Sequence, residues 1–386
     1  MPKIVHIIAS LHRGGAETML CRLLQRMDTR CYPPVVIALM RGGSLEGEIR
    51  AMGIPVYHAD MRQGRPSMRA LAKVASILRR ERPDVVHGWM VHGNLAAQFA
   101  CLLVAPPRPA VIWAVHHTVD SLRREKPLTA GLIRLCAFLS SGRRAPREIV
   151  YVSRASRAQH EALGYMAAKG RVIPNGIDTE SFAPSEAHCV LLRHELGLPY
   201  DAPLIGLMGR FHPQKDHRNF LRAAKMIAAK CPEATFILAG DGVDCKNLEL
   251  AAMLKESGVE KSVKLLGERR DMDLVTSGLD IAVSASAYGE SLSLALGEAM
   301  ACGVPCVTTD LGDHGELVGS TGVVVKPEDP AALAEGCLSL LRMGREGRQS
   351  LGARARERII SHYSLAAAVQ RYEELYSLQL PREEGD

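Results

Sequence analysis

Residues 285–305 read ASAYGESLSLALGEAMACGVP, and this stretch decides how the rest of the chain is interpreted. The residues before it, 281–284, form a short apolar run typical of a buried strand, whereas residues 292–300 carry apolar side chains at helical spacing. A strand that leads into a helix points the free N–H groups and the positive end of the helix dipole outward. The backbone is therefore expected to form an anion site at Ser291, Leu292, Ser293 and Leu294.

Two glutamates flank this predicted site. Glu290 lies in the expected loop and Glu298 two turns inside the helix, so both can reach a ligand along its first turns without sharing one helix face. A carboxylate accepts hydrogen bonds from two hydroxyls, which suits the vicinal diols of a sugar. The alternative interpretation is structural, with Glu290 as a charge at the helix N-terminus and Glu298 as a solvated helix residue.

The block from Glu290 to Glu298, followed by AMACGVP at 299–305, resembles the signature of the retaining glycosyltransferase family 4. The resemblance implies an α/β protein of the GT-B fold, with two Rossmann-like parallel-sheet domains facing across a cleft. It further implies that Glu290 binds and positions the donor sugar and that Glu298 binds the ribose of the nucleotide. Ser291 and Ser293 stand where the family often has glycine, so the sugar itself stays open.

Length and charge agree with two domains of different character. The 386 residues are 47% hydrophobic, which is enough for two sizeable cores. Residues 1–178 contain 26 lysines and arginines against 12 acidic residues, and the remainder contains 22 against 30. The basic N-terminal half predicts an anionic partner, and charge alone allows nucleic acid, anionic lipid or a phosphorylated acceptor. With the family resemblance, the expected partners are a nucleotide sugar and a glycan or lipid-linked acceptor, not nucleic acid.

The cysteines and the chain start indicate a cytoplasmic protein. Ten cysteines occur without a C-x-x-C pair, which predicts reduced thiols and no zinc site. The apolar residues 3–9 are too few for a signal peptide, and no apolar run reaches the ~18 residues of a membrane span. Asp271 in D-x-D at 271–273 opens a predicted helix, so we expect an N-cap there. We expect neither a metal nor a cofactor beyond the nucleotide sugar, with UDP favoured over GDP.

Short apolar runs alternate with helical patterns along both halves of the chain, which predicts two doubly wound parallel sheets. The predicted strands are 4–9, 35–40, 55–58, 85–87, 110–115, 149–152 and 172–173, then 204–208, 235–239, 263–266, 281–284, 306–308 and 323–325. The motif IPNGID at 173–178 marks the domain change. We expect an acceptor domain at 1–180, a donor domain at 181–363 and a last helix in 364–386 that rejoins the first domain.

Polar residues follow the strands of the first half, where doubly wound sheets bind ligands. Two glycines, Gly14 and Gly15, allow close approach of a ligand before a helix, or they form a plain strand-to-helix turn. The resemblance places these glycines under the donor diphosphate, and Glu17 toward the acceptor. The same strand ends carry His92 and Asn94, which we assign to the acceptor side, and His116 and His117, either of which matches a histidine that the family places near the donor sugar.

Two cations follow the first strand of the second half. Arg210 and Lys215 lie five residues apart in GRFHPQK, which starts at Gly209, and can neutralise the diphosphate that leaves with the nucleotide. The spacing resembles the GR-x4-K pattern of the family, and the alternative is scattered surface charge. The resemblance also puts the nucleotide base near Arg269.

The segment 122–147 is basic and amphipathic. It can lie on anionic lipid headgroups or pack on its own domain with a solvated basic face. We expect a transferase that acts on a lipid-linked or polysaccharide acceptor at the cytoplasmic membrane face. The alternatives are a soluble acceptor, a sugar-nucleotide epimerase or hydrolase of the same fold, and an inactive homologue that only binds the donor.

Overall fold

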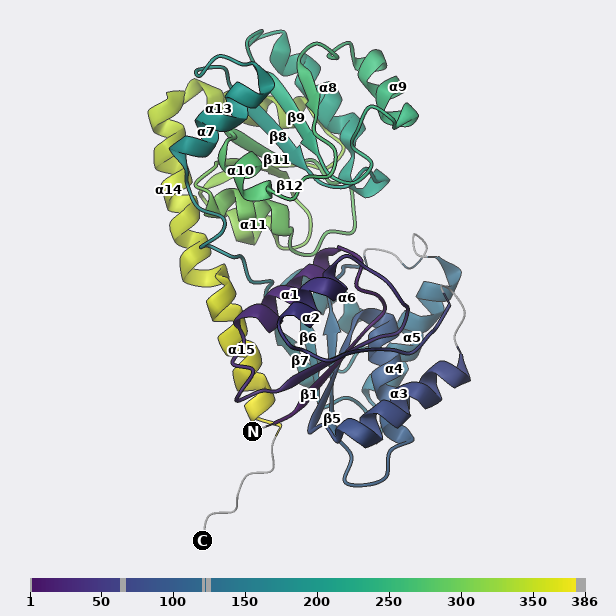
Figure 1. The fold of residues 1–386 in the computed structure, drawn as a ribbon. Coiled ribbons are helices and arrows are strands. Elements are labelled where there is room, and N and C mark those ends of the chain that lie inside the picture. Colours follow the sequence, from purple (N-terminus) through teal and green to yellow (C-terminus); the bar gives the residue numbers. More distant parts are fainter. Residues whose placement is uncertain (1, 63–66, 120–121, 123–125, 380–386) are drawn as a thin grey trace. The chain divides into compact units, whose positions relative to one another are not determined.

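The computed structural model describes residues 2–62, 67–119, 122 and 126–379, and the chain divides into two compact units (Figure 1). The first unit is Met1–Gly176 with Leu365–Asp386, and the second is Ile177–Ser364. Each is built on a parallel sheet with helices on both faces. The predicted α/β architecture with two Rossmann-like sheets is confirmed, and the donor and acceptor roles of the domains stay predictions.

The first unit has seven parallel strands in the order β3-β2-β1-β4-β5-β6-β7. Its elements are β1 (Ile4–Ile8), α1 (Gly15–Arg26), β2 (Pro34–Ala38), α2 (Leu45–Ala51), β3 (Val56–His58), α3 (Met68–Glu81), β4 (Val85–Trp89), α4 (Met90–Leu102), β5 (Ala110–Val115), α5 (Pro127–Ser140), β6 (Glu148–Tyr151), α6 (Arg154–Ala162), a 3-10 turn (Ala167–Lys169), β7 (Gly170–Val172) and α15 (Leu365–Ser377). The chain leaves β1 toward β2 and leaves β4 toward β5, so the loops after β1 and β4 diverge where such sheets bind ligands.

Alternation along the strands sends side chains of the first unit into two cores, one on each face of the sheet. Ile4 and Ile8 on β1 pack in the same core as residues of α1 and α15, whereas Val5 and Ile7 pack with residues of α3 and α4. The tyrosines of α15, the last helix, lie in the first of these cores. The predicted return of the last helix to the N-terminal domain is therefore confirmed.

The second unit has six parallel strands in the order β10-β9-β8-β11-β12-β13. Its elements are α7 (Glu186–Leu196), β8 (Leu204–Met208), a 3-10 turn (Pro213–Lys215), α8 (His217–Ala228), β9 (Thr235–Ala239), α9 (Leu248–Ser257), β10 (Val263–Leu265), α10 (Met272–Ser277), β11 (Ile281–Ser284), α11 (Leu294–Ala301), β12 (Cys306–Thr309), α12 (His314–Val318), β13 (Gly322–Val325), α13 (Pro330–Arg342) and α14 (Gly344–Tyr363). Here the direction of winding reverses between β8 and β11. The loops that follow these two strands carry the predicted donor residues.

Candidate functional site

A lysine and a glutamate meet where the winding of the second unit reverses. Lys215, at the end of the loop after β8, forms an ion pair through Nζ with Oε1 of Glu290, which lies in the loop after β11. Ser286 Oγ donates a hydrogen bond to the same carboxylate oxygen at 3.0 Å. The side chains of the pair are only 20% and 10% exposed, so the interaction is largely shielded from water. The structure thus joins two predicted site residues that lie 75 positions apart.

Further bonds hold these two loops together. Gln214 accepts a hydrogen bond from the backbone N–H of Ala287 at 2.9 Å through its carbonyl oxygen, and its side-chain Nε2 donates to the carbonyl of Gly289 at 2.9 Å. On the other side, Gly312 has a φ of +54°, and a Cβ there would lie 2.3 Å from the carbonyl oxygen of Glu290. Only glycine fits this close approach without a shift of the loop. The position of Glu290 is therefore set by the backbone on two sides.

The charge of Glu290 depends on its partners. Burial by itself raises the pKa of the carboxyl, but the positive charge of Lys215, the imidazole of His314 and the bonds from Lys215 and Ser286 outweigh it, so the pKa lies below its ordinary value. The carboxylate is therefore ionised near neutral pH. An ionised carboxylate accepts hydrogen bonds and donates none, which suits it to binding sugar hydroxyls.

The sequence analysis missed His314, a buried side chain at the start of α12. Its Nδ1 lies 3.0 Å from Thr308 Oγ1 and 3.3 Å from the carbonyl oxygen of Thr309, and burial lowers its pKa below the ordinary value. Its Nε2 is buried without a hydrogen-bond partner among the described residues. A usable signal existed, because His314 follows the carboxyl end of β12, the same kind of position that singled out the other site residues.

Helix α11, within residues 285–305, starts later than the sequence predicted. Ser293 is the N-cap of α11, and its Oγ accepts from the backbone N–H of Leu296 at 3.4 Å. Ser291 and Leu292 therefore precede the helix, and the open N–H groups of the first turn belong to Leu294 and the residue after it. A cavity opens at this turn, lined by Gly206, Leu207, Met208, Lys215, Ala282, Val283, Ser284, Ala285, Ser286, Ser293, Ala295 and Leu296. The helix therefore starts two residues later than predicted, and the anion site at Ser291, Leu292, Ser293 and Leu294 stays a prediction.

The second glutamate occupies the predicted place. Glu298 lies in the second turn of α11, four residues beyond the first residue of that helix, and its side chain is partly exposed. Glu290 lies outside the helix, in the loop before it. This geometry is the loop-and-helix arrangement inferred from the sequence, and the proposed contact of Glu298 with ribose stays a prediction.

The two predicted cations differ in their surroundings. Arg210 is exposed and forms no ion pair with the described residues, whereas Lys215 is paired with Glu290. The backbone N–H of Gly209 donates to the carbonyl of Ala239 at 2.8 Å and anchors the start of the loop. The guanidinium of Arg210 therefore has its five N–H donors available for an anion.

The guanidinium of Arg269, unlike that of Arg210, is already bound to carboxylates. Its guanidinium donates to both carboxylate oxygens of Asp271, at 2.8 and 2.7 Å, and it pairs with Glu195. These bonds raise the pKa of the guanidinium above its ordinary value. Asp271 occupies the N-cap position of α10 as predicted, but its carboxylate binds Arg269 instead of capping the helix. A contact between Arg269 and the nucleotide base would therefore use a guanidinium that is already bound by two carboxylates, those of Asp271 and Glu195.

In the first unit, the glycine turn lies at the start of α1. Gly14 is the N-cap of that helix and Gly15 its first residue. A Cβ at Gly14 would lie 2.6 Å from Oε2 of Glu17, so the carboxylate of Glu17 folds back over the turn. An acid in the first turn also interacts favourably with the helix dipole. The structure gives Glu17 this local contact, and its acceptor-side role stays a prediction.

The two residues assigned to the acceptor side after β4 lie in α4. His92 is in the first turn and exposed. Asn94 is 1% exposed, and its side-chain amide donates to the carbonyl of Ala114 at 3.1 Å and accepts from the N–H of the same residue at 3.2 Å. Both ends of the amide are thus used to hold α4 against β5, which is a structural role.

The adjacent histidines after β5 face opposite sides of the sheet. His116 stacks on Trp89, with ring centroids 5.0 Å apart and 24° between the planes, on the side of the sheet that α1 covers. His117 lies on the other side, edge to face with His160 at 5.1 Å. Burial lowers the pKa of both rings to about 3. His116 is therefore the one on the same side as the Gly14–Gly15 turn, a choice that the sequence left open.

The described residues also include no group of three or more His, Cys, Asp or Glu side chains that could hold a metal ion. All ten cysteines are free thiols. Asp271 and Asp273 of the D-x-D stretch therefore form no such group. Independence from metals stays a prediction about the reaction.

Comparison with known proteins gives the family. The family described as Glycosyltransferase Family 4 matches residues 13–181, and Glycosyl transferases group 1 matches residues 202–343. A D-inositol 3-phosphate glycosyltransferase of Xylanimonas cellulosilytica is 32% identical over 95% of this chain and 89% of its own. An Escherichia coli UDP-Gal:alpha-D-GlcNAc-diphosphoundecaprenol alpha-1,3-galactosyltransferase is 26% identical over 71% of this chain and 70% of its own.

The fold agrees with these relationships. The crystal structure of HepE of Anabaena in complex with UDP-glucose superposes with a TM-score of 0.84, at 22% identity, over 98% of this chain and all of that one. This likeness shows the same fold, and the two family matches with the 32% identical relative give the family. The chain belongs to glycosyltransferase family 4 of the group 1 enzymes, and it transfers a sugar from a nucleotide-sugar donor.

Proposed function

We propose that the second unit binds a UDP-sugar and that the enzyme transfers the sugar with retention of configuration and without a metal ion. The ion pair between Lys215 and Glu290 carries this proposal, because it places a cation and an ionised carboxylate at the open end of α11. Arg210 and Lys215 neutralise the charge that develops on the leaving diphosphate. Glu290 positions the sugar through its hydroxyls, and Glu298 binds the ribose. UDP is favoured because the E. coli relative is a UDP-Gal-dependent galactosyltransferase.

Binding of the diphosphate changes the partner of Lys215. In the structure, this lysine neutralises Glu290. An arriving diphosphate competes with Glu290 for the ammonium group of Lys215. The carboxylate oxygens of Glu290 can then accept hydrogen bonds from sugar hydroxyls. Ser286 keeps its 3.0 Å bond to Glu290 and holds the carboxylate in place. The pair therefore links diphosphate binding to sugar binding.

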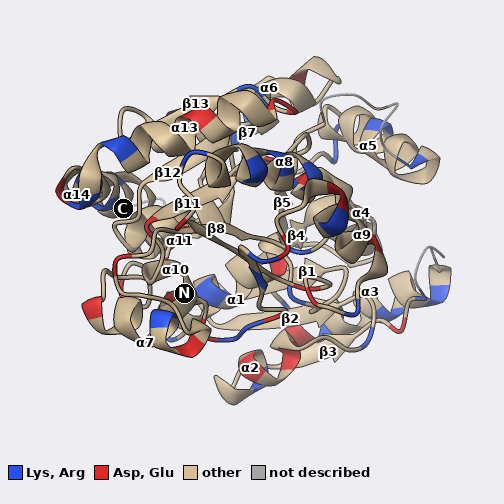
Figure 2. Cartoon of the chain, turned by 90° about the horizontal axis from the view of Figure 1, so that it is seen from above, with Lys and Arg blue, Asp and Glu red and all other residues tan. Residues whose placement is uncertain are grey.

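We propose that the acceptor is lipid-linked and that the enzyme binds peripherally to the cytoplasmic face of the membrane. Helix α5 supports this, because Leu128, Leu135 and Phe138 are 51%, 36% and 76% exposed, large apolar side chains that face outward. Arg143 and Arg144 follow the helix and are exposed, and the ribbon of α5 in Figure 2 carries blue but no red. Apolar side chains with flanking cations are what an anionic bilayer surface binds.

The basic segment 122–147 was predicted to include Arg123 and Arg124, which lie outside the described residues. No helix in the described part of the chain is long and apolar enough to span a bilayer. The proposed attachment is through the surface of α5 and the arginines after it. Each basic residue near an anionic surface contributes ~1 kcal/mol, so a few suffice for reversible binding.

A second candidate is a soluble anionic acceptor. The relative that covers 95% of this chain is named a D-inositol 3-phosphate glycosyltransferase. A phosphorylated polyol would also explain the basic first half of the chain. It would leave the exposed apolar side chains of α5 without a role.

One acceptor experiment separates these candidates. Purified protein is incubated with UDP- or GDP-sugars and either GlcNAc-diphosphoundecaprenol in detergent or inositol 3-phosphate. Products are identified by mass spectrometry, and the anomeric configuration of the new bond is read from NMR coupling constants. Transfer from a UDP-sugar to the lipid with retained configuration supports the proposal. Transfer only to inositol 3-phosphate would replace the lipid acceptor, and an inverted product would reject retention.

Membrane binding is tested by sedimentation with vesicles of phosphatidylglycerol or of phosphatidylcholine. Phe138→Ser combined with Arg143→Gln and Arg144→Gln should lower binding to the anionic vesicles by about tenfold or more, since two charges and one large apolar side chain are lost. The matched control replaces two exposed arginines elsewhere in the same unit, Arg30→Gln and Arg69→Gln. Equal binding of both variants would contradict docking through α5.

A further inference from the structure

One peptide group of the second unit is bound at both of its ends. It joins Ser286 to Ala287 in the loop after β11. Its carbonyl oxygen accepts a hydrogen bond from the hydroxyl of Thr309, the last residue of β12, at 2.7 Å. Its N–H donates to the carbonyl of Gln214, in the loop after β8, at 2.9 Å. Because a peptide group is planar, bonds at both ends fix its orientation.

Thr309 reaches this peptide group because β8, β11 and β12 are neighbours in the sheet. The pairing of β11 with β12 ends at Ser284 and Thr308, whereas the backbone of Thr309 still pairs with Val325 of β13. Threonine suits a strand, and its hydroxyl can donate where the backbone pairing with β11 has ended. The side chain is fully buried, so water does not compete for this bond.

The fixed peptide group leads to the ion pair of the candidate site. The hydroxyl of Ser286 donates to the carboxylate of Glu290 at 3.0 Å, and the same carboxylate pairs with Lys215. Ser286 and Lys215 both line the cavity at the first turn of α11. The direction of a serine hydroxyl depends on the backbone that carries it. The hydroxyl of Thr309 therefore affects how Ser286 approaches Glu290.

The residues that follow β12 also hold the other side of Glu290. The N–H of Asp313 donates to the carbonyl of Ser291, the next residue after Glu290, at 2.9 Å. The N–H of Leu311 donates to the carbonyl of Thr309 at 3.0 Å, which ties this loop to the end of the strand. The segment that carries Glu290 is thus bound to one short stretch of chain both before and after the glutamate.

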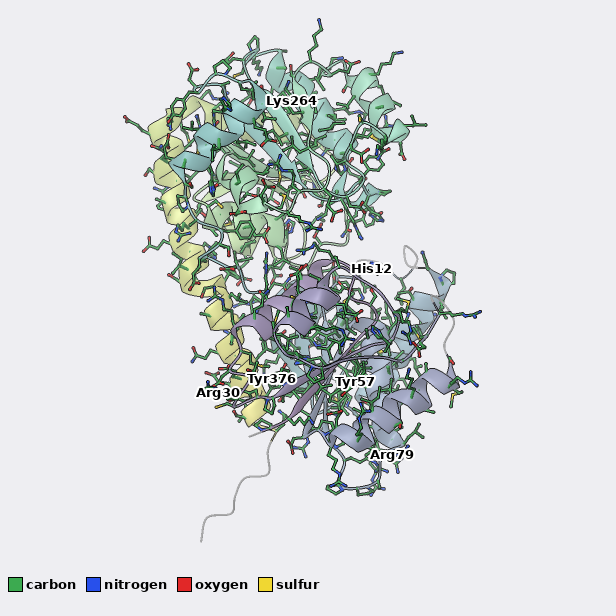
Figure 3. The ribbon with its side chains drawn as sticks, in the orientation of Figure 1. His12, Arg30, Tyr57, Arg79, Lys264 and Tyr376 are labelled. Atoms are coloured by element: carbon green, nitrogen blue, oxygen red, sulfur yellow. The ribbon has the colours of Figure 1, made fainter. Side chains whose placement is uncertain are left out.

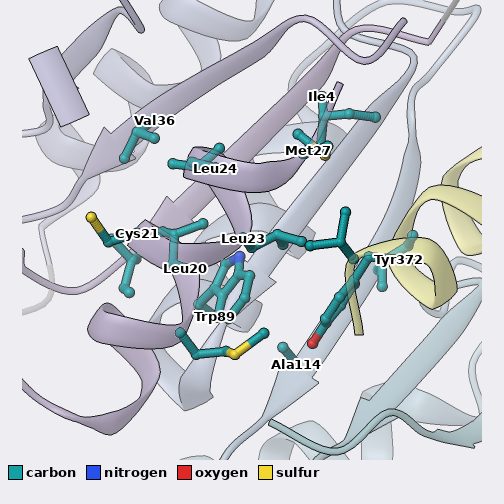
Figure 4. Close-up of a cluster of buried hydrophobic side chains, with 14 of the residues drawn as sticks. Ile4, Leu20, Cys21, Leu23, Leu24, Met27, Val36, Trp89, Ala114 and Tyr372 are labelled. Carbon is teal, nitrogen blue, oxygen red and sulfur yellow. The ribbon is translucent and has the colours of Figure 1, made fainter. Parts of the chain in front are cut away.

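Buried side-chain hydrogen bonds of the first unit have a different setting. The indole Nε1 of Trp89 donates to Nδ1 of His6 at 3.1 Å, and Figure 4 shows Trp89 in its hydrophobic core. The hydroxyl of Tyr376 lies 2.8 Å from Nδ1 of His87, and both side chains are fully buried (Figure 3). These bonds hold strands and the last helix together. The bond from Thr309 differs because it ends at a residue that lines a cavity.

We propose that Thr309 is a positioning residue for the donor sugar. Its hydroxyl holds the peptide group between Ser286 and Ala287, and through Ser286 it keeps the carboxylate of Glu290 in place. This inference rests on the proposed function in that Glu290 binds the sugar hydroxyls. Thr309 acts on the sugar part of the nucleotide sugar, so its loss weakens binding of the sugar and not of the nucleotide.

The test compares the affinities of the full-length protein for UDP-glucose and for UDP, measured by calorimetry, because the two probes differ by the glucosyl group. Thr309→Val keeps the branched shape and removes the hydroxyl, so the ratio of the two affinities should fall about tenfold. Thr309→Ser keeps a hydroxyl and should restore the ratio. The matched control is Thr321→Val, because the buried hydroxyl of Thr321 also donates to a backbone carbonyl, that of Val318, at 2.7 Å. This control should leave the ratio unchanged.

Glu290→Gln separates a failure of this inference from a failure of the proposed function. If Glu290→Gln lowers the ratio and Thr309→Val does not, the inference is overturned. An equal fall in Thr321→Val would also overturn it, because general loosening of the unit would then explain the effect. If Glu290→Gln leaves the ratio unchanged, the proposed sugar role of Glu290 fails.

A crystal structure of Thr309→Val without ligand decides the positioning by itself. We expect the distance between the hydroxyl of Ser286 and the carboxylate of Glu290 to exceed about 3.5 Å, the limit of a hydrogen bond. An unchanged bond of 3.0 Å would show that Thr309 does not position the carboxylate.

Discussion

The two units differ in the charge of the residues that follow their strands: these residues are charged in the second unit and neutral in the first. In the second unit, Lys215 and Glu290 are both charged and stabilise each other, with the exposed Arg210 nearby in the same loop. In the first unit, His116 sits among neutral rings, and burial keeps its pKa at about 3. A charged pair suits a diphosphate, whereas neutral hydrogen-bonding groups suit hydroxyls. The difference shows that one fold, used twice, can surround the residues after its strands with charges in one unit and with neutral rings in the other.

The largest effect is expected from breaking the charged pair. Lys215→Met leaves Glu290 buried without its cation, which should lower the free energy of unfolding by about 3 kcal/mol because a buried charge loses its partner. Turnover should fall by roughly a hundredfold or more, since a cation facing the leaving diphosphate is lost. Urea denaturation and initial rates of UDP release from UDP-glucose measure the two effects.

Lys215→Arg is the control, because it keeps the charge and changes the geometry. It should retain most of the stability that Lys215→Met loses. If Lys215→Met is as stable and as active as the wild type, the ion pair is not the centre of the donor site.

The second prediction separates the effect of a positive charge on turnover from its effect on the stability of the fold. Arg210→Ala should also lower turnover by roughly a hundredfold, for the same electrostatic reason. Its stability should stay within about 0.5 kcal/mol of the wild type, because the guanidinium is exposed and has no ion pair with the described residues. The same urea and rate measurements apply. A large loss of stability, or full activity, would show that the two cations do not share one function.

The third prediction uses pH to tell the two regions apart. His6 and His116 have pKa values of about 3 in the folded protein against roughly 6.5 in an unfolded chain. The unfolded chain therefore binds more protons between these values, and stability falls by about 1.4 kcal/mol per pH unit per histidine as the pH drops below 6.5. Glu290, whose pKa is lowered, loses its stabilising contribution only below about 4.3.

Tryptophan fluorescence during acid titration measures this difference, because both tryptophans, Trp89 and Trp113, lie in the first unit. His6→Asn keeps an acceptor for the indole N–H but does not titrate, so the acid transition should move to lower pH. Glu290→Gln should leave the fluorescence transition above pH 5 in place. An unchanged transition in His6→Asn would show that the buried histidines do not drive acid unfolding of this unit.

The smallest effect is expected at Arg269. Asp271→Asn removes one of its two carboxylate partners, and the remaining pair with Glu195 keeps the guanidinium in place. The side chains of Asp271 and Glu195 are 46% and 45% exposed, so stability should change by less than about 1 kcal/mol. KM for UDP-glucose reports whether Arg269 faces the base. A tenfold change in KM would mean that this ion-pair cluster is part of the donor site.

Several details of the site could be predicted from the sequence, and others could not. Glu290 in a loop and Glu298 inside the helix followed from apolar spacing, which is a local property. The start of α11 was predicted too early, because the cap at Ser293 depends on one side-chain hydrogen bond that periodicity does not show. His314 was missed although it follows a strand end, because its electrostatic interaction with Glu290 joins two residues that no local pattern connects.

Both doubly wound sheets could be predicted from the sequence, because strand and helix periodicities and the Gly and Pro breaks are properties of short stretches of chain. The sequence also determined which loops carry polar residues. Long-range packing determines that Lys215 pairs with Glu290 and that the side chains of Asn94 and Arg269 already have partners. It also places His116 and His117 on opposite sides of the sheet. These outcomes depend on strand order and on packing between distant segments, which no local pattern encodes.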